Sequence, residues 1–154
     1  MNLSDLLNNN QIEKIACQLS DVKNRRNKAY RIFNFSKKSL VGLGAGDEDI
    51  IYTNLYNAVR ISCEAILLLY GYRAKKSSEG HHYLVINAAS ELMNKELENE
   101  FSRIQKMRQK RNRFDYGDLT GISQAELQQA IDDAGALLKK IDELIKNKEN
   151  QLGI

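Results

Sequence analysis

The chain has no proline and no tryptophan, and it contains only two cysteines and two histidines among its 154 residues. Because proline is the residue that most strongly breaks helices, its absence favours a mostly helical protein. Cys17 and Cys63 stand in helical patterns without the CxxC spacing of a metal or redox site. We therefore expect two buried, reduced thiols.

Long apolar runs are also missing. No run approaches the roughly 18 apolar residues that a membrane-spanning helix requires. The first residues, MNLSDLLNNNQIEK, lack the cationic segment followed by an apolar segment that marks a signal peptide. These two absences predict a cytoplasmic protein.

What the chain does contain is a globular composition, with 42% hydrophobic and 28% charged residues. Its length and composition predict a single domain over residues 1–154, with the core at about 20–148. The formal net charge is only +3. Any affinity for nucleic acid must therefore come from local clustering of basic residues and not from the total charge.

Apolar residues recur at helical spacing along most of the chain, and no segment alternates convincingly like a strand. Residues 4–19 predict one broken helix or two short ones, and residues 81–93 predict another short helix. The fold class is therefore all-α, a bundle of four main helices with one or two short N-terminal helices. The four main helices are expected over residues 20–41, 47–70 and 96–116, and from the Ser123–Glu126 capping box onward.

The segment 47–70, DEDIIYTNLYNAVRISCEAILLLY, is the strongest predicted helix, and Gly71 is placed to end it. Apolar residues occur on nearly every side of this helix, which indicates burial on more than one face. In a small bundle, such a helix suggests an oligomer interface as well as a core. We therefore expect a homodimer.

The segment KMRQKRNRFDYG, residues 106–117, is basic but follows an apolar helical stripe that begins at Leu97. At about 100° per residue, that stripe continues into a polar set of residues, namely Arg108, Arg111, Asn112 and Asp115. The other basic residues fall largely on the opposite side, namely Arg103, Lys106, Lys110 and Arg113. This second set is expected to face water, where it either solvates the helix or holds phosphate groups.

Two interpretations of the inward set stay open. In the structural one, the buried arginines join an ion-pair network, with Asp115 four residues after Arg111 and Glu64 in need of a cation within an apolar helix. In the functional one, the set lines a polar cleft for a ligand, because a guanidinium group matches phosphate in a two-pronged geometry. Spacing alone favours neither interpretation.

The stretch RNRFDY, Arg111 to Tyr116, resembles the RNxxxH form of the Arg-x4–6-His motif of HEPN domains. The stretch LLLYGYR…GHHYLVI, a long helix closed by Gly71 and followed by a helix that begins with histidines, also looks like many HEPN proteins. The resemblance covers most of the chain. It implies a small, generally dimeric helical bundle that binds RNA or a nucleotide, in which two copies of the motif meet across the dimer.

Many HEPN proteins are metal-independent endoribonucleases, in which the arginine steadies a phosphate and the histidine transfers protons. The resemblance assigns these roles to Arg111 and Asn112, but Tyr116 occupies the position of the histidine. A tyrosine with its usual pKa near 10 is a poor general base at neutral pH. We therefore expect ribonuclease activity to be weak or lost, with binding retained.

His81 and His82 begin a different helix, and nothing in the spacing brings them to Arg111. No metal site or cofactor is predicted. The resemblance also suggests a toxin–antitoxin or defence module, with a minimal nucleotidyltransferase as a partner. Two alternatives stay open, namely an active ribonuclease that uses Tyr116 or a histidine from elsewhere, and a helical dimeric interaction protein without a nucleic-acid role.

Overall fold

The computed structural model describes residues 1–41, 47–75, 80–115 and 121–153. These residues form six helices and two short strands. In chain order the elements are α1 (Leu3–Asn8), β1 (Ile12–Lys14), α2 (Leu19–Val41), α3 (Glu48–Leu69), β2 (Tyr72–Ala74), α4 (His81–Leu92), α5 (Glu98–Asp115) and α6 (Gln124–Leu152). The expected all-α class is confirmed, with α2, α3, α5 and α6 as the long helices.

The N-terminal segment differs from the expectation. The helix α1 ends at Asn8, and Asn10 has a left-handed backbone with φ 61°. The chain then forms β1, which pairs antiparallel with β2, with Ile12 opposite Ala74. The prediction of helix in the second half of residues 4–19 is therefore wrong, because residues 12–14 form a strand and residues 15–18 have no regular secondary structure. A strand of three residues is too short to show alternation, and its partner lies far along the chain.

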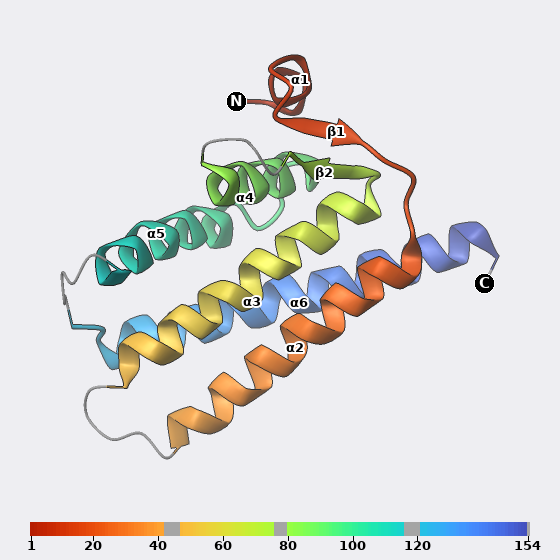
Figure 1. Cartoon of the computed structure of the whole chain (residues 1–154). Helices are drawn as coiled ribbons and strands as arrows, with labels where there is room; N and C mark the ends of the chain where they lie inside the picture. The colour runs from red at the N-terminus through yellow and green to blue at the C-terminus, as the bar shows by residue number, and fades with distance from the viewer. Residues whose placement is uncertain (42–46, 76–79, 116–120, 154) are drawn as a thin grey trace.

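The helix α3 lies at the centre of the bundle, with α2 on one side and α4 and α5 on the other (Figure 1). It also packs along α6, which runs behind it in the same view. Four neighbouring helices of its own chain thus cover the apolar faces of α3. The all-round apolar pattern is explained within one chain, so it no longer supports the expected homodimer.

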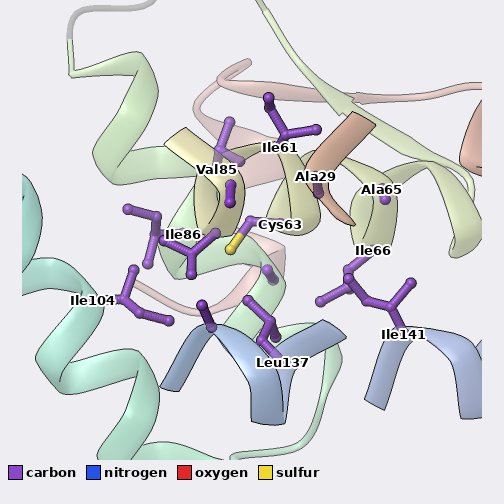
Figure 2. Close-up of a cluster of buried hydrophobic side chains, with 14 of the residues drawn as sticks. Ala29, Ile61, Cys63, Ala65, Ile66, Val85, Ile86, Ile104, Leu137 and Ile141 are labelled. Atoms are coloured by element: carbon purple, nitrogen blue, oxygen red, sulfur yellow. The ribbon is translucent and has the colours of Figure 1, made fainter. Parts of the chain in front are cut away.

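The core gathers buried side chains from all six described helices, and Figure 2 shows part of it. The labelled residues of this cluster are Ala29 of α2, Ile61, Cys63, Ala65 and Ile66 of α3, Val85 and Ile86 of α4, Ile104 of α5, and Leu137 and Ile141 of α6. Burial raises the pKa of the Cys63 thiol, as expected for an inert core residue. Cys17 is only half-buried, so the prediction of two buried thiols is wrong for Cys17.

Helix ends follow local signals that the sequence displays. The hydroxyl of Ser123 accepts from the backbone N–H of Glu126 at 3.1 Å, and the Glu126 carboxylate accepts from the backbone N–H of Ser123 at 3.3 Å. Gly71 follows α3 with φ 82°, and its carbonyl accepts from the Ile15 N–H at 2.8 Å.

Within the described part of the chain, no helix has the length and apolar character needed to cross a membrane.

Candidate anion-binding site

The helix α5 has an apolar face built from Phe101, Ile104 and Met107, all nearly fully buried. Beyond Met107, the side of α5 that lies against α3 and α4 becomes polar. Arg108, Arg111 and Asn112 are half-buried there. The predicted change from an apolar to a polar lining is therefore present, and it occurs near the C-terminal end of the helix.

Arg111 reaches both neighbouring helices. Its Nη1 lies 3.2 Å from Nδ1 of His82 on α4. Its guanidinium carbon stands 5.2 Å from the ring centroid of Tyr56, a fully buried residue of α3. A cation over an aromatic face at this distance is attracted by the ring quadrupole. Tyr56 therefore forms an aromatic wall that helps to hold the Arg111 guanidinium beside His82.

Arg108 stands one turn before Arg111. Its Nε donates to Oε1 of Gln105 at 3.1 Å, and its guanidinium carbon lies 5.5 Å from the ring centroid of Tyr83. Among the described residues, Arg108 has no carboxylate partner. It therefore adds a positive charge to this junction without an acid to neutralise it.

His82 is neutral in this setting. Burial and the charges of Arg60, Arg111, His81 and Arg108 lower the pKa of His82 to about 4. Removing water from a charged imidazolium disfavours it, and so do nearby cations. Because a guanidinium only donates hydrogen bonds, Nδ1 must be the acceptor from Arg111, which leaves the ring proton on Nε2.

Arg60 completes the set of cations and lies on α3, four residues after Tyr56. Its Nη1 donates to Oε1 of Glu64 at 2.6 Å. Its Nε is buried and has no hydrogen-bond partner in the described part of the structure. A buried N–H without a partner costs free energy, so this donor favours a site that an acceptor completes.

The ion-pair partners of Glu64 test the structural interpretation of the inward set, in which Glu64 and Asp115 neutralise the arginines. Its carboxylate lies 2.6 Å from Nη1 of Arg60 and 3.8 Å from Nε of Arg25. Glu64 is thus paired, as expected for a carboxylate in an apolar helix, but its cations come from α3 and α2. The side chain of Asp115, the other acid of the suggested network, lies outside the described residues, as does Tyr116.

The predicted water-facing set divides in two. Lys106 and Arg113 are exposed, whereas Lys110 is half-buried and forms an ion pair with Glu126, the acid of the α6 capping box. The hydrogen bond from Lys110 is the largest cause that lowers the pKa of the Glu126 carboxyl. Lys110 therefore ties α5 to α6, and of this set Lys106 and Arg113 are the cations left to face solvent.

The prediction that Arg103 simply faces water is wrong. Its Nε donates to Oδ2 of Asp133 at 2.8 Å and its Nη2 donates to Oδ1 at 2.9 Å. Asp133 belongs to α6 and is only 2% exposed, and Gln129 also donates to it at 3.0 Å. A two-pronged pair with a buried carboxylate makes Arg103 a structural residue.

His81 does not join the cluster around Arg111. Its Nδ1 lies 3.3 Å from the carbonyl of Lys75, and its ring centroid is 6.1 Å from that of His82. Adjacent side chains on a helix point about 100° apart, which separates the two histidines. Among the described residues, no group of three or more His, Cys, Asp or Glu residues could hold a metal ion.

The sequence did not indicate three residues of this site, namely Tyr56, Arg60 and His82. A signal for the first two was present, because Tyr56 and Arg60 are four residues apart and interrupt an otherwise apolar helix with polar groups on one face. His82 carried no such signal, since its contact with Arg111 joins residues 29 apart.

No protein-family model, curated protein or solved structure matches the chain.

Proposed function

We propose that this chain is a HEPN-like protein that binds the phosphate of RNA or a nucleotide where α3, α4 and α5 meet. The single observation that carries the proposal is the contact of the Arg111 guanidinium with the neutral ring of His82 and the aromatic ring of Tyr56, with Arg108 one turn earlier on the same helix. Guanidinium groups bind phosphate with paired, charge-assisted hydrogen bonds. A bound anion would neutralise Arg108, which has no carboxylate partner among the described residues.

The donor set suits a phosphate. Arg60 contributes a buried N–H without a partner, and His82 contributes the Nε2–H that its contact with Arg111 leaves on the ring. Asn112, half-buried beside Arg111, adds an amide that donates to phosphate or to a base edge. The exposed Arg113 lies one turn from Lys110 and Gln109, and it extends the basic surface outward for a longer chain of phosphates.

The resemblance of RNRFDY to the HEPN motif supports RNA or a nucleotide as the ligand. It also supports a toxin–antitoxin or defence module in which the partner is a minimal nucleotidyltransferase or a second copy of this chain. With Tyr116 in place of the motif histidine, binding without efficient cleavage is the primary function that we propose.

The test is a titration with fluorescently labelled single-stranded RNA at low and moderate salt, with inorganic phosphate as a competitor. We expect Arg111→Gln to weaken binding about 10-fold to 100-fold, as for the removal of a charge-assisted hydrogen bond. The slope of log K against log salt should fall by about 0.7 for each phosphate that the variant no longer binds.

The matched control is Arg73→Gln, which removes an exposed arginine of β2 that pairs with Glu13. It should leave RNA affinity unchanged. Binding that is insensitive to salt, or equally weakened by both variants, would refute the phosphate site. Salt-insensitive binding would favour a helical interaction protein without a nucleic-acid role.

A metal-independent endoribonuclease is the second candidate, and the short distance between Arg111 and His82 favours it. As observed, Nδ1 of His82 is occupied by Arg111 and cannot take a proton. A bound phosphate would draw the Arg111 guanidinium toward itself, free Nδ1 and raise the pKa of His82 through its negative charge. His82 would then accept the proton of an RNA 2′-hydroxyl as that oxygen attacks phosphorus and the bond to the 5′-oxygen breaks. The products are a 2′,3′-cyclic phosphate and a 5′-hydroxyl, whose leaving oxygen takes its proton from water.

This second candidate predicts cleavage that resists EDTA and needs the 2′-hydroxyl on the 5′ side of the broken bond. His82→Gln should abolish cleavage and largely retain RNA binding. If the wild-type protein leaves RNA intact while binding it, the ribonuclease hypothesis is wrong and the binding function stands.

A further inference from the structure

The outward face of α2 carries a basic and aromatic surface that the candidate site does not use. At about 100° per residue, five residues fall within one narrow stripe of this helix. All five are exposed, and they are Asn24, Lys28, Arg31, Phe35 and Lys38. We call these residues the α2 strip. With a rise of about 1.5 Å per residue, the strip is about 20 Å long.

Apart from Lys37, which lies 5.3 Å from the ring centroid of Phe33, the cations of α2 fall into two groups. Those in its first two turns are balanced by acids of other helices, since Lys23 pairs with Glu149 at 2.7 Å and Arg26 pairs with Asp142 at 3.2 Å. The cations of the α2 strip are not balanced. In the described residues, Lys28, Arg31 and Lys38 form no ion pair. The middle and end of α2 therefore present an outward-facing positive potential.

Phe35 stands in the middle of this positive surface and is 65% exposed. Phe33, two residues earlier, is 8% exposed and packs in the core. The packing of α2 against the bundle therefore uses Phe33 and does not need Phe35. By helical spacing, Arg31 lies one turn before Phe35 and Lys38 lies one turn after it. An exposed ring flanked by cations on both sides is poorly explained by folding, because its apolar surface remains in water.

We propose that the α2 strip is a second contact surface for single-stranded nucleic acid, with one base stacked on Phe35 and the adjacent phosphates held by Lys28, Arg31 and Lys38. A cationic track with an aromatic platform is the combination that single strands require, because every base has a face that stacks. The proposal rests on the proposed function for its ligand class, but it involves a different surface. The helices α2 and α5 lie on opposite sides of α3 (Figure 1).

The composition of the strip favours nucleic acid over a lipid surface. A helix that lies in a membrane interface needs a broad apolar face toward the lipid. The apolar face of α2 is already buried in the bundle, with Val22, Ala29 and Phe33 in the core. Phe35 is the one apolar side chain of the strip, which suits a single stacking contact.

The test uses a single-stranded DNA of about 12 nucleotides with a central 2-aminopurine, which lacks the 2′-hydroxyl and so remains intact. Phe35→Leu keeps an apolar side chain and removes the ring. We expect it to weaken binding about fivefold or more and to abolish the fluorescence change that stacking produces. Arg31→Gln combined with Lys38→Gln should lower the salt slope by about 1.4.

Two controls separate the strip from other surfaces. Tyr70→Ala removes an aromatic residue that is 44% exposed at the C-terminal end of α3, and it should change neither affinity nor fluorescence. Arg111→Gln measures how much the candidate site contributes to binding of the same oligonucleotide. If Phe35→Leu has no effect while Arg111→Gln weakens binding, the strip is refuted and the proposed function stands.

The reverse result, with Phe35→Leu impaired and Arg111→Gln unchanged, would support the strip and refute the candidate site. If the protein binds anionic vesicles and not the oligonucleotide, and Phe35→Leu still binds the vesicles, the α2 strip contacts lipid and the proposal is wrong. Circular dichroism should show unchanged helix content in each variant, because Phe35 and the two cations are exposed.

Discussion

Nη1 of Arg111 lies 3.2 Å from Nδ1 of His82, and this contact joins α5 to α4 across 29 residues of sequence. Burial and nearby cations keep the ring of His82 neutral, and the charged donor at Nδ1 places its proton on Nε2. In the same arrangement, the pKa of His82 depends on the charges of the nearby arginines. Its protonation should respond to pH, to anions and to the removal of Arg111.

Acid should destabilise the protein through His82. Its pKa is lowered to about 4 in the folded chain, against about 6.5 in an unfolded one. Between these values the unfolded state binds more protons, so this contribution to stability is complete above pH 6.5 and is lost as pH falls toward 4. After allowance for solvent screening of a partly exposed ring, we expect about 1–2 kcal/mol.

The measurement is urea denaturation of the wild type and of His82→Gln from pH 4 to 7. The glutamine variant should lack this part of the pH dependence, while the carboxylates titrate alike in both proteins. Parallel stability curves over the whole range would show that His82 titrates normally in the fold.

An anion in the cluster should raise the pKa of His82. Phosphate would offset the charges of Arg60, Arg108 and Arg111, which help to lower that pKa. The ring protons of His82, followed by NMR, should titrate at a higher pH when inorganic phosphate or a nucleotide replaces chloride. His81 is the internal control, because its Nδ1 lies at the Lys75 carbonyl and not at the arginines. An equal shift of both histidines would indicate a general ionic effect.

If Arg111 serves the proposed ligand, Arg111→Gln should change stability by less than about 1 kcal/mol, because Glu64 keeps Arg60 and Arg25 as its cations. The substitution should also raise the pKa of His82, since one of the charges that lower it is removed. A thermal melt and the NMR titration check both effects. A drop of several kcal/mol would instead favour the interpretation of Arg111 as a structural residue.

Arg103→Met should cost about 2–3 kcal/mol of stability. It leaves the carboxylate of Asp133, 2% exposed, with Gln129 as its remaining donor. Chemical denaturation measures this effect, and the double change of Arg103→Met with Asp133→Leu should recover part of the stability. Lys106→Met on the exposed face of α5 is the matched control, with an expected change within about 0.5 kcal/mol.

Gly71→Ala should destabilise the protein by about 1–3 kcal/mol. Gly71 has φ 82°, and an added Cβ would lie 3.1 Å from the carbonyl oxygen of Ile15, a backbone atom. Gly121→Ala is the control, because a Cβ there meets nothing within 4 Å. Equal melting temperatures for both variants would show that the turn after α3 tolerates a side chain.

The helices could be predicted from the sequence because their signals are local. The apolar spacing of α3 and α6, the capping pair of Ser123 and Glu126, and Gly71 after α3 all act within a few residues of chain. The basic segment on α5 was visible for the same reason, and so was the inward side of the helix on which Arg108, Arg111 and Asn112 lie.

The partners of the charged side chains, by contrast, depend on tertiary packing. Arg103 follows the outward pattern of its helix, yet α6 brings the buried Asp133 to it across 30 residues. His82 shows no local link to Arg111, yet the packing of α4 against α5 places the two side chains in contact. Contacts of this kind depend on how helices pack against each other, and the spacing within one helix does not contain that information.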